Sequence, residues 1–268
     1  MVIYLGTTSS CNLACTYCYR SDNCLTNRIV HRQLPLPMVA RILDLMRLDY
    51  PNQQWRFVLH GHEPLTCGYE YLERLLDLLD QPGSPPNFYV RTNGTVLNGK
   101  LARLLGKYRV NVGISIDGPE FLHDSIRVFA NGRGSLKRIM KNIDLLRDHG
   151  IEPTVFCVYT KRSLGHEKSI YDFFSANHLS FQFAPVANVT TADVHGLRLT
   201  PSEAAAFHNA IFDAYFFDTE RTIRIDRIDK FIARILNSKR ESRRKSCFEG
   251  ALFLDYDGHC YRLCGLRW

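Results

Sequence analysis

The sequence has no run of apolar residues long enough to cross a bilayer, which takes about 20 residues in a helix. Its first residues also lack the features of a secretory signal peptide, because Met1 leads straight into a short strand-like run. No internal repeat and no low-complexity segment is present. We therefore expect a cytoplasmic protein without a membrane partner. Its 268 residues fit one large domain, or one domain with a small appendage.

Apolar and basic residues are both plentiful. Hydrophobic residues make up 45% of the chain, with 16 Phe and 13 Tyr, which is ample for a buried core. The formal net charge of +7 favours an acidic or phosphorylated partner. Much of this charge falls in the run Lys239–Lys245, and such runs form solvated loops more often than nucleic-acid sites. We therefore do not expect nucleic acid as a partner.

Three of the nine cysteines, Cys11, Cys15 and Cys18, fall within eight residues. Thiolates are the soft ligands of iron–sulfur clusters, and a four-iron cluster takes four of them, one per iron. With three local ligands, one iron keeps an open position that a small chelating molecule can fill. Buried apolar cysteines at helical spacing are an alternative, but the segment opens on hydroxyl residues and has no helical apolar stripe. A zinc knuckle is another, but the paired C-x-x-C halves of such sites are absent.

Strand-like and helix-like segments alternate along the first two thirds of the chain. Such alternation predicts a parallel sheet, which right-handed crossovers would curl into a barrel with its site at the carboxyl ends of the strands. The expected strands are Val2–Leu5, Trp55–His60, Asn87–Arg91, Val110–Ile116, Thr154–Tyr159 and Ser180–Ala184. The expected helices between them are Pro37–Leu48, Tyr69–Asp80, Gly99–Lys107, Ser135–His149 and His166–Ser175.

The pattern changes after Pro185. Two helices are expected, Pro201–Phe217 with Thr200 as its N-cap, and Asp226–Asn237. Asp257-Gly258 between apolar runs then predicts a hairpin. The cysteines Cys247, Cys260 and Cys264 flank and follow this hairpin.

The spacing Cys11-x-x-x-Cys15-x-x-Cys18, with Tyr17 directly before the last cysteine, resembles the radical S-adenosylmethionine (SAM) enzymes. The resemblance implies an α/β fold, a partial (β/α)6 TIM-like barrel, and a [4Fe-4S] cluster held by these cysteines. It also implies that the open iron binds the amino and carboxylate groups of SAM. One electron, from a flavodoxin- or ferredoxin-like reductant, then cleaves SAM to a 5′-deoxyadenosyl radical that abstracts hydrogen from the substrate.

The turns after the later strands strengthen this resemblance. Gly61-His62-Glu63-Pro64 resembles the GGEP loop that hydrogen-bonds the SAM amino group, with His62 in place of the second glycine. Taken singly, Asn93-Gly94 and Asp117-Gly118 are ordinary turn sequences. Arg127 can pair with the methionyl carboxylate through a charge-assisted hydrogen bond. The cofactor-binding residues that the resemblance implies are Tyr17, Gly61, His62, Glu63, Pro64, Thr92, Asn93, Ser115, Asp117, Arg127 and Gln182.

Two further runs, Ser115 to Ser135 and Gln182-Phe-Ala-Pro185, resemble the sulfatase-maturing and peptide-modifying branch of these enzymes. In that branch a C-terminal extension, called SPASM when long and twitch when short, holds auxiliary clusters. The resemblance implies one auxiliary iron–sulfur cluster, and its metal ligands would be Cys247, Cys260 and Cys264. Its remaining ligand could be Cys24, Cys67, Cys157, water or substrate, although Cys157 lies mid-strand and fits buried core better.

This interpretation divides the chain into a radical SAM partial barrel (1–190), a helical connector (191–246) and a truncated SPASM/twitch-like tail (247–268). In sulfatase-maturing enzymes an Asp follows the hairpin cysteine and is taken as the base, whereas Gly265 follows Cys264 here. We therefore do not expect formylglycine formation. We also expect no N-terminal leader-peptide-recognition domain of the sort that many peptide-modifying relatives carry.

The function we expect is radical hydrogen abstraction from a peptide or protein side chain. The first alternative is the same chemistry on a small molecule such as a sugar or nucleoside. An iron–sulfur electron-transfer or sensor protein is the second, and it would need the thiols but not the SAM loops. No catalytic acid, base or hydrogen donor can be assigned from the residues alone.

Overall fold

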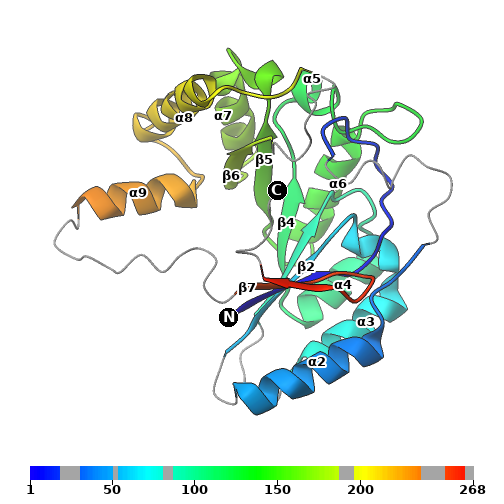
Figure 1. The fold of residues 1–268 in the computed structure, drawn as a ribbon. Helices are drawn as coiled ribbons and strands as arrows, with labels where there is room; N and C mark the ends of the chain where they lie inside the picture. Colours follow the sequence, from blue (N-terminus) through cyan, green and yellow to red (C-terminus); the bar gives the residue numbers. More distant parts are fainter. Residues whose placement is uncertain (19–30, 51–53, 81–86, 187–195, 237–250, 263–268) are drawn as a thin grey trace.

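The computed structural model describes residues 1–18, 31–50, 54–80, 87–186, 196–236 and 251–262. These residues form one sheet with the strand order β6-β5-β4-β3-β2-β1-β7-β8 (Figure 1). The first six strands are neighbours in sequence order, and each pairs parallel with the next. Their bounds are β1 Val2–Gly6, β2 Arg56–His60, β3 Phe88–Thr92, β4 Asn111–Ser115, β5 Thr154–Tyr159 and β6 Phe181–Pro185.

Helices connect these strands and cover the outer face of the sheet (Figure 1). Parallel strands that follow one another in sequence order, each with a helix after it, make the sheet curl in one direction. The described strands do not close this sheet into a ring. The predicted partial barrel is therefore confirmed. The helices are α2 Leu36–Asp49, α3 Tyr69–Leu79, α4 Gly99–Lys107, α5 Glu120–His123, α6 Leu136–Arg147 and α7 Glu167–Ala176, with 3-10 turns η1 Pro64–Cys67 and η2 Lys161–Ser163.

The apolar core lies between the sheet and these helices. Helix α3 shows how the sequence builds it, because Leu72, Leu75, Leu76 and Leu79 recur at helical spacing and all four are buried. Burying each such side chain stabilises the fold by about 1.5–3 kcal/mol. Along β5, buried and half-buried residues alternate, so that one side of the strand faces this core.

Beyond β6 the chain forms α8 Pro201–Phe216 and α9 Asp226–Leu236. Thr200 caps α8 as predicted, since its hydroxyl accepts from the Glu203 backbone N–H at 3.2 Å and the Glu203 side chain accepts from the Thr200 N–H. Helix α9 extends from the β6 edge of the sheet (Figure 1). Among the described residues, no helix is both long and apolar enough to span a membrane.

The predicted hairpin consists of β7 Ala251–Leu254 and β8 Cys260–Arg262, which pair antiparallel around Gly258 at φ 87°. Its position was not predicted: β7 adds to the sheet as a parallel neighbour of β1. Gly6 permits this approach, because a Cβ there would lie 2.4 Å from the Asp255 carboxylate. A four-residue apolar run does not reveal its partner strand, so the sequence could not show this pairing.

Candidate functional site

A cavity of about 690 Å³ opens at the carboxyl ends of the parallel strands. This is the edge where parallel barrels place their active sites, and the volume lies within the ~300–1,000 Å³ range of ligand pockets. The predicted site residues that line it are Cys11, Cys15, Tyr17, Cys18, Gly61, His62, Thr92, Asn93, Ser115, Arg127 and Gln182. Glu63, Pro64 and Asp117 lie behind this lining, and all three are buried.

The cysteine segment crosses the top of the sheet in an irregular, non-helical conformation. It is held from one side by backbone hydrogen bonds from Ala14 N–H to Val128 O (2.8 Å) and from Thr16 N–H to Ile126 O (3.1 Å). On the other side, the Glu63 N–H donates to Ser10 O at 2.9 Å. The thiols are therefore not a buried helical stripe. Instead, the segment lies between the loop after β2 and the chain that carries Arg127.

The three thiols suit a cluster. Cys11, Cys15 and Cys18 are all half-buried, and all three face the same cavity. Within the described ranges, no three His, Cys, Asp or Glu side chains gather closely enough to hold one metal ion. A four-iron cluster makes a different demand, because each thiolate binds its own iron. The donor set therefore fits a cluster with one thiolate per iron.

The loop after β2 carries His62 in place of the second glycine of the GGEP loop. Gly61 has φ 117°, a conformation that favours glycine, but His62 lies outside this left-handed region. Its Nδ1–H donates to Thr8 O at 3.2 Å, and its ring meets Tyr256 of the hairpin edge-on at 6.0 Å between centroids. A side chain at this second position is therefore accommodated without backbone strain.

Glu63 ties the loops after β2 and β3 together. Its Oε1 accepts from Leu65 N–H (3.1 Å) and Thr92 Oγ1–H (2.6 Å), and its Oε2 accepts from Asn93 N–H (2.6 Å). Burial raises the pKa of Glu63 to about 7, against the lowering effect of these three hydrogen bonds. Glu63 therefore fixes the positions of Thr92 and Asn93 at the cavity wall.

Asn93 extends this connection to the cysteines. Its Nδ2–H donates to Asn12 Oδ1 at 2.9 Å and lies 3.9 Å from the Cys11 sulfur. Asn12 in turn donates to Thr95 Oγ1 at 2.7 Å. N–H groups directed at thiolate sulfurs are among the contacts that tune a cluster. The turn after β3 thus contributes a donor to the first cysteine.

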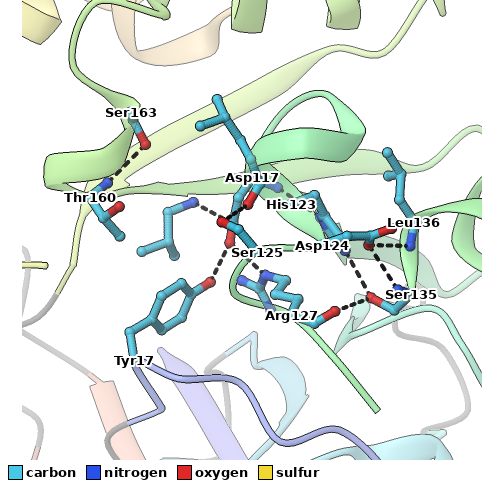
Figure 2. Close-up of polar contacts among 12 residues, drawn as sticks. Tyr17, Asp117, His123, Asp124, Ser125, Arg127, Ser135, Leu136, Thr160 and Ser163 are labelled. Carbon is cyan, nitrogen blue, oxygen red and sulfur yellow. Dashed lines mark hydrogen bonds and ion pairs between the residues drawn. The ribbon is translucent and has the colours of Figure 1, made fainter. Parts of the chain in front are cut away.

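A buried ion pair joins Arg127 and Asp117 (Figure 2). Arg127 Nε–H donates to Asp117 Oδ2 at 2.9 Å, and the Tyr17 hydroxyl donates to the same oxygen at 2.7 Å. The other oxygen, Oδ1, accepts from Val158 N–H at 3.0 Å. Burial raises the pKa of Tyr17 well above its usual value, so the phenol stays protonated and keeps donating. Asp117 therefore orients both Tyr17 and Arg127.

His123 supports this ion pair from behind (Figure 2). Its Nδ1 accepts from Asp117 N–H at 3.2 Å, so the proton is on Nε2, which donates to Ser135 Oγ at 2.9 Å. The Ser135 hydroxyl then donates to Arg127 O at 2.7 Å. Burial lowers the pKa of His123 to about 4, so the ring is neutral at pH 7. The chain of hydrogen bonds connects the two residues of the ion pair through their backbones.

The remaining cysteines differ from these three. Cys67 and Cys157 are buried, and burial raises the pKa of both thiols, to about 12 for Cys67. Cys67 donates to Thr7 O at 3.6 Å, while Cys157 lies mid-strand, as predicted for a core residue. Cys260 is exposed on β8. Cys24, Cys247 and Cys264 lie outside the described residues, so the proposed auxiliary cluster stays a prediction.

Several lining residues were not predicted from the sequence: His60, Arg91, Phe156, Asp226, Arg227 and Lys230. Alternation along β3 could have suggested Arg91, because it is an exposed cation between buried Val90 and Thr92. Nothing in the sequence marks Asp226, Arg227 and Lys230, because the fold alone brings α9 to the cavity.

The sequence profile of the Radical SAM superfamily matches residues 5–168. The chain belongs to this superfamily, and it is therefore an enzyme that uses SAM and a [4Fe-4S] cluster. It is 28% identical to a cysteine-type anaerobic sulfatase-maturating enzyme of Clostridium novyi over 94% of this chain and 70% of that enzyme. Its fold matches native anSMEcpe with bound AdoMet at a TM-score of 0.79 and 22% identity, covering 98% of this chain and 74% of that one. The structure of native anSMEcpe with bound AdoMet and Cp18Cys peptide matches at a TM-score of 0.77 and 21% identity, covering 97% of this chain and 73% of that one.

Proposed function

We propose that this radical SAM enzyme abstracts hydrogen from a side chain of a peptide or protein. The observation that carries the proposal is the cavity, which Cys11, Cys15 and Cys18 line together with most of the predicted SAM contacts. Arg91, Phe156 and Gln182 also line a second hollow of about 380 Å³ that borders this cavity. The Clostridium novyi relative, by name a sulfatase-maturating enzyme, supports a protein substrate.

Cys11, Cys15 and Cys18 would hold the cluster, whose electron cleaves SAM to the radical that abstracts hydrogen. Arg127 would bind the methionyl carboxylate, because this residue lines the cavity while Asp117 fixes its orientation through Nε. Thr92 and Asn93 would contact the cofactor from the turn that Glu63 holds. Glu63 itself, with all three of its donors supplied by the protein, would act as a positioning residue.

The remaining assignments extend the proposal to residues outside the described ranges. An auxiliary cluster at Cys247, Cys260 and Cys264 would take up an electron or position the substrate. The division into a barrel (1–190), a connector (191–246) and a tail (247–268) goes with it, as does a flavodoxin- or ferredoxin-like reductant. Because Gly265 follows Cys264, the expected product is not formylglycine. A small-molecule substrate is the second candidate, favoured by the cavity volume of about 690 Å³, which lies within the range of small-ligand pockets.

The test uses reconstituted enzyme, SAM, a reductant and a synthetic peptide with a central cysteine deuterated at its β-carbon, all without oxygen. We expect 5′-deoxyadenosine to form and to carry deuterium. Unlabelled 5′-deoxyadenosine would contradict hydrogen abstraction from this peptide and turn attention to small molecules. Absence of 5′-deoxyadenosine would contradict the assignment of the three cysteines and the SAM contacts.

A further inference from the structure

Helix α9 places two cations at the cavity. Arg227 and Lys230 both line it, together with Asp226. Ile228, between them in sequence, is buried and anchors the helix, while the Arg227 guanidinium donates to Phe183 O at 3.4 Å on β6. Lys230 forms an i, i+4 ion pair with Asp226 at 2.5 Å, and the side chain of Lys230 remains 68% exposed. The helix is thus fixed with a basic face toward the site.

A third cation, Arg91, approaches from the opposite side, on the inner face of β3. Its guanidinium lies over the Phe156 ring, 4.0 Å from the centroid. Phe156 can take this position only because residue 113 is glycine, since a Cβ there would lie 2.6 Å from the ring. The Phe156 ring, which Gly113 makes room for, therefore holds the Arg91 guanidinium, and both Arg91 and Phe156 line both cavities.

The charge of this lining is strongly one-sided. Four cationic residues line the larger cavity, Arg91, Arg127, Arg227 and Lys230, and Asp226 is the one carboxylate among the described lining residues. Asp117 compensates Arg127 from behind. The wall formed by Arg91, Arg227 and Lys230, here called the basic wall, therefore has an excess of positive charge. A cavity with apolar walls and one sign of charge concentrates ligands of the opposite sign.

We infer that the substrate carries a carboxylate close to the residue that reacts, and that the basic wall binds it. The inference rests on the proposed peptide substrate and names its class, an acidic peptide. Two arginines suit this ligand, because a guanidinium matches a carboxylate with two parallel hydrogen bonds. A nucleic acid strand fits less well, since it requires a long basic groove that follows successive phosphates, and these three cations line a single cavity.

Binding to two synthetic peptides tests the inference. Both peptides have ten residues, a central cysteine and blocked termini. In the acidic peptide Asp and Glu flank the cysteine, and in the neutral peptide Asn and Gln take their places. Calorimetry on reconstituted enzyme with SAM, at low salt and without oxygen, should show about tenfold tighter binding of the acidic peptide, the value of one charge-assisted hydrogen bond. Arg91→Gln, Arg227→Gln and Lys230→Gln should each reduce this preference severalfold, with circular dichroism showing that the variants fold.

Two control variants match the test residues in environment. Arg162 is exposed and donates to a backbone carbonyl, Ser125 O, as Arg227 does to Phe183 O. Lys168 pairs with Asp172 at i, i+4 and 2.6 Å, as Lys230 does with Asp226. Neither control residue lines the cavity. Arg162→Gln and Lys168→Gln should leave the preference for the acidic peptide unchanged.

The other outcomes separate this inference from the proposed function. Equal binding of the two peptides, or an equal loss in the controls, overturns the basic wall but leaves a peptide substrate in place. Binding of neither peptide, in enzyme that cleaves SAM, overturns the peptide substrate and this inference with it. Tighter binding of a ten-nucleotide single-stranded DNA than of the acidic peptide would assign the cations to phosphates and overturn the inference.

Discussion

The two sides of the cavity are built in opposite ways. On the cofactor side, which we define as Glu63, Thr92, Asn93, Asp117 and Arg127, every residue is buried and every one has hydrogen-bond partners from other loops. On the basic wall, the cations Arg227 and Lys230 are exposed, and their contacts are one carbonyl and one neighbouring carboxylate. The side chains of the cofactor side are therefore held in position before a ligand binds, whereas those of Arg227 and Lys230 are held by few contacts.

Fixing the cofactor side has an energetic consequence. A buried ion pair or carboxylate is tolerated only while its partners stay in place, so single changes there cost several kcal/mol. Exposed charges such as those of α9 contribute about 0–1 kcal/mol to stability, so their side chains can change contacts when a ligand binds without destabilising the fold. A site built in this way keeps one reaction geometry constant while its other side adapts to a substrate.

The largest effect is expected at the three cluster cysteines. Cys11→Ala, Cys15→Ala or Cys18→Ala should each abolish SAM cleavage, because a lost thiolate leaves a second iron without its ligand. The measurement is 5′-deoxyadenosine formed by reconstituted enzyme, with iron content determined in parallel. Cys260→Ala is the control, since this exposed thiol lies on β8 and does not line the cavity, and it should still cleave SAM. Wild-type cleavage in any of the three variants would contradict the assignment.

Arg127 should show the next largest effect. Arg127→Ala leaves Asp117 buried without its cation, which is expected to lower the free energy of unfolding by about 3–5 kcal/mol. Urea denaturation measures it, and calorimetry should show weaker SAM binding by about 1.5–3 kcal/mol.

The matched control for Arg127 is Arg47→Ala, which breaks an exposed i, i+3 pair with Asp44 at 3.1 Å. It should change the free energy of unfolding by less than about 1 kcal/mol. If both variants lose the same stability, the contrast between a fixed and an exposed side is wrong. If Arg127→Ala binds SAM normally, Arg127 has a structural role only.

His123 should make stability depend on pH. Its folded pKa of about 4 lies below the ordinary value of 6.5, so the unfolded state takes up a proton first as the pH falls. The contribution of the neutral His123 ring to the free energy of unfolding is complete above about pH 6.5. It is lost as the pH falls from about 6.5 to about 4. The loss is about 3 kcal/mol, because each unit of pKa difference is worth about 1.36 kcal/mol. His123→Asn should flatten this part of the stability profile, and His166→Asn, at an exposed histidine, should not. Parallel profiles for wild type and His123→Asn would refute the argument.

Much of the fold and the cofactor side could be predicted from the sequence, because both follow from local patterns. The alternation of strands and helices, the cysteine spacing and the turns after the strands are all visible within a few residues. The hydrogen-bond partners of Glu63 and His123 could not be predicted from local patterns. The Glu63 side chain bonds to Asn93, 30 residues further along the chain, and the His123 side chain bonds to Ser135, 12 residues further along. The basic wall and the pairing of β7 with β1 depend on how distant segments meet, which no local pattern reports.

The smallest of the four effects is expected at Glu63. Glu63→Gln keeps the shape and leaves one oxygen, which can still accept from Leu65 and Thr92, but its NH₂ group then faces the Asn93 N–H. Two donors facing each other in a buried place should lower the free energy of unfolding by about 1–3 kcal/mol. The comparison should be made at pH 8, because the pKa of Glu63 is raised to about 7 and the carboxylate must be ionised.

Glu70→Gln is the control for Glu63, since Glu70 is exposed and pairs with Lys100 on the surface, and it should change little. The Glu63 variant should also cleave SAM more slowly, because the turn that carries Thr92 and Asn93 would shift against the cavity. Wild-type stability at pH 8 would show that the loop after β3 keeps its place without Glu63. The cofactor side would then be less fixed than its hydrogen bonds indicate, and the two sides of the cavity would differ in exposure alone.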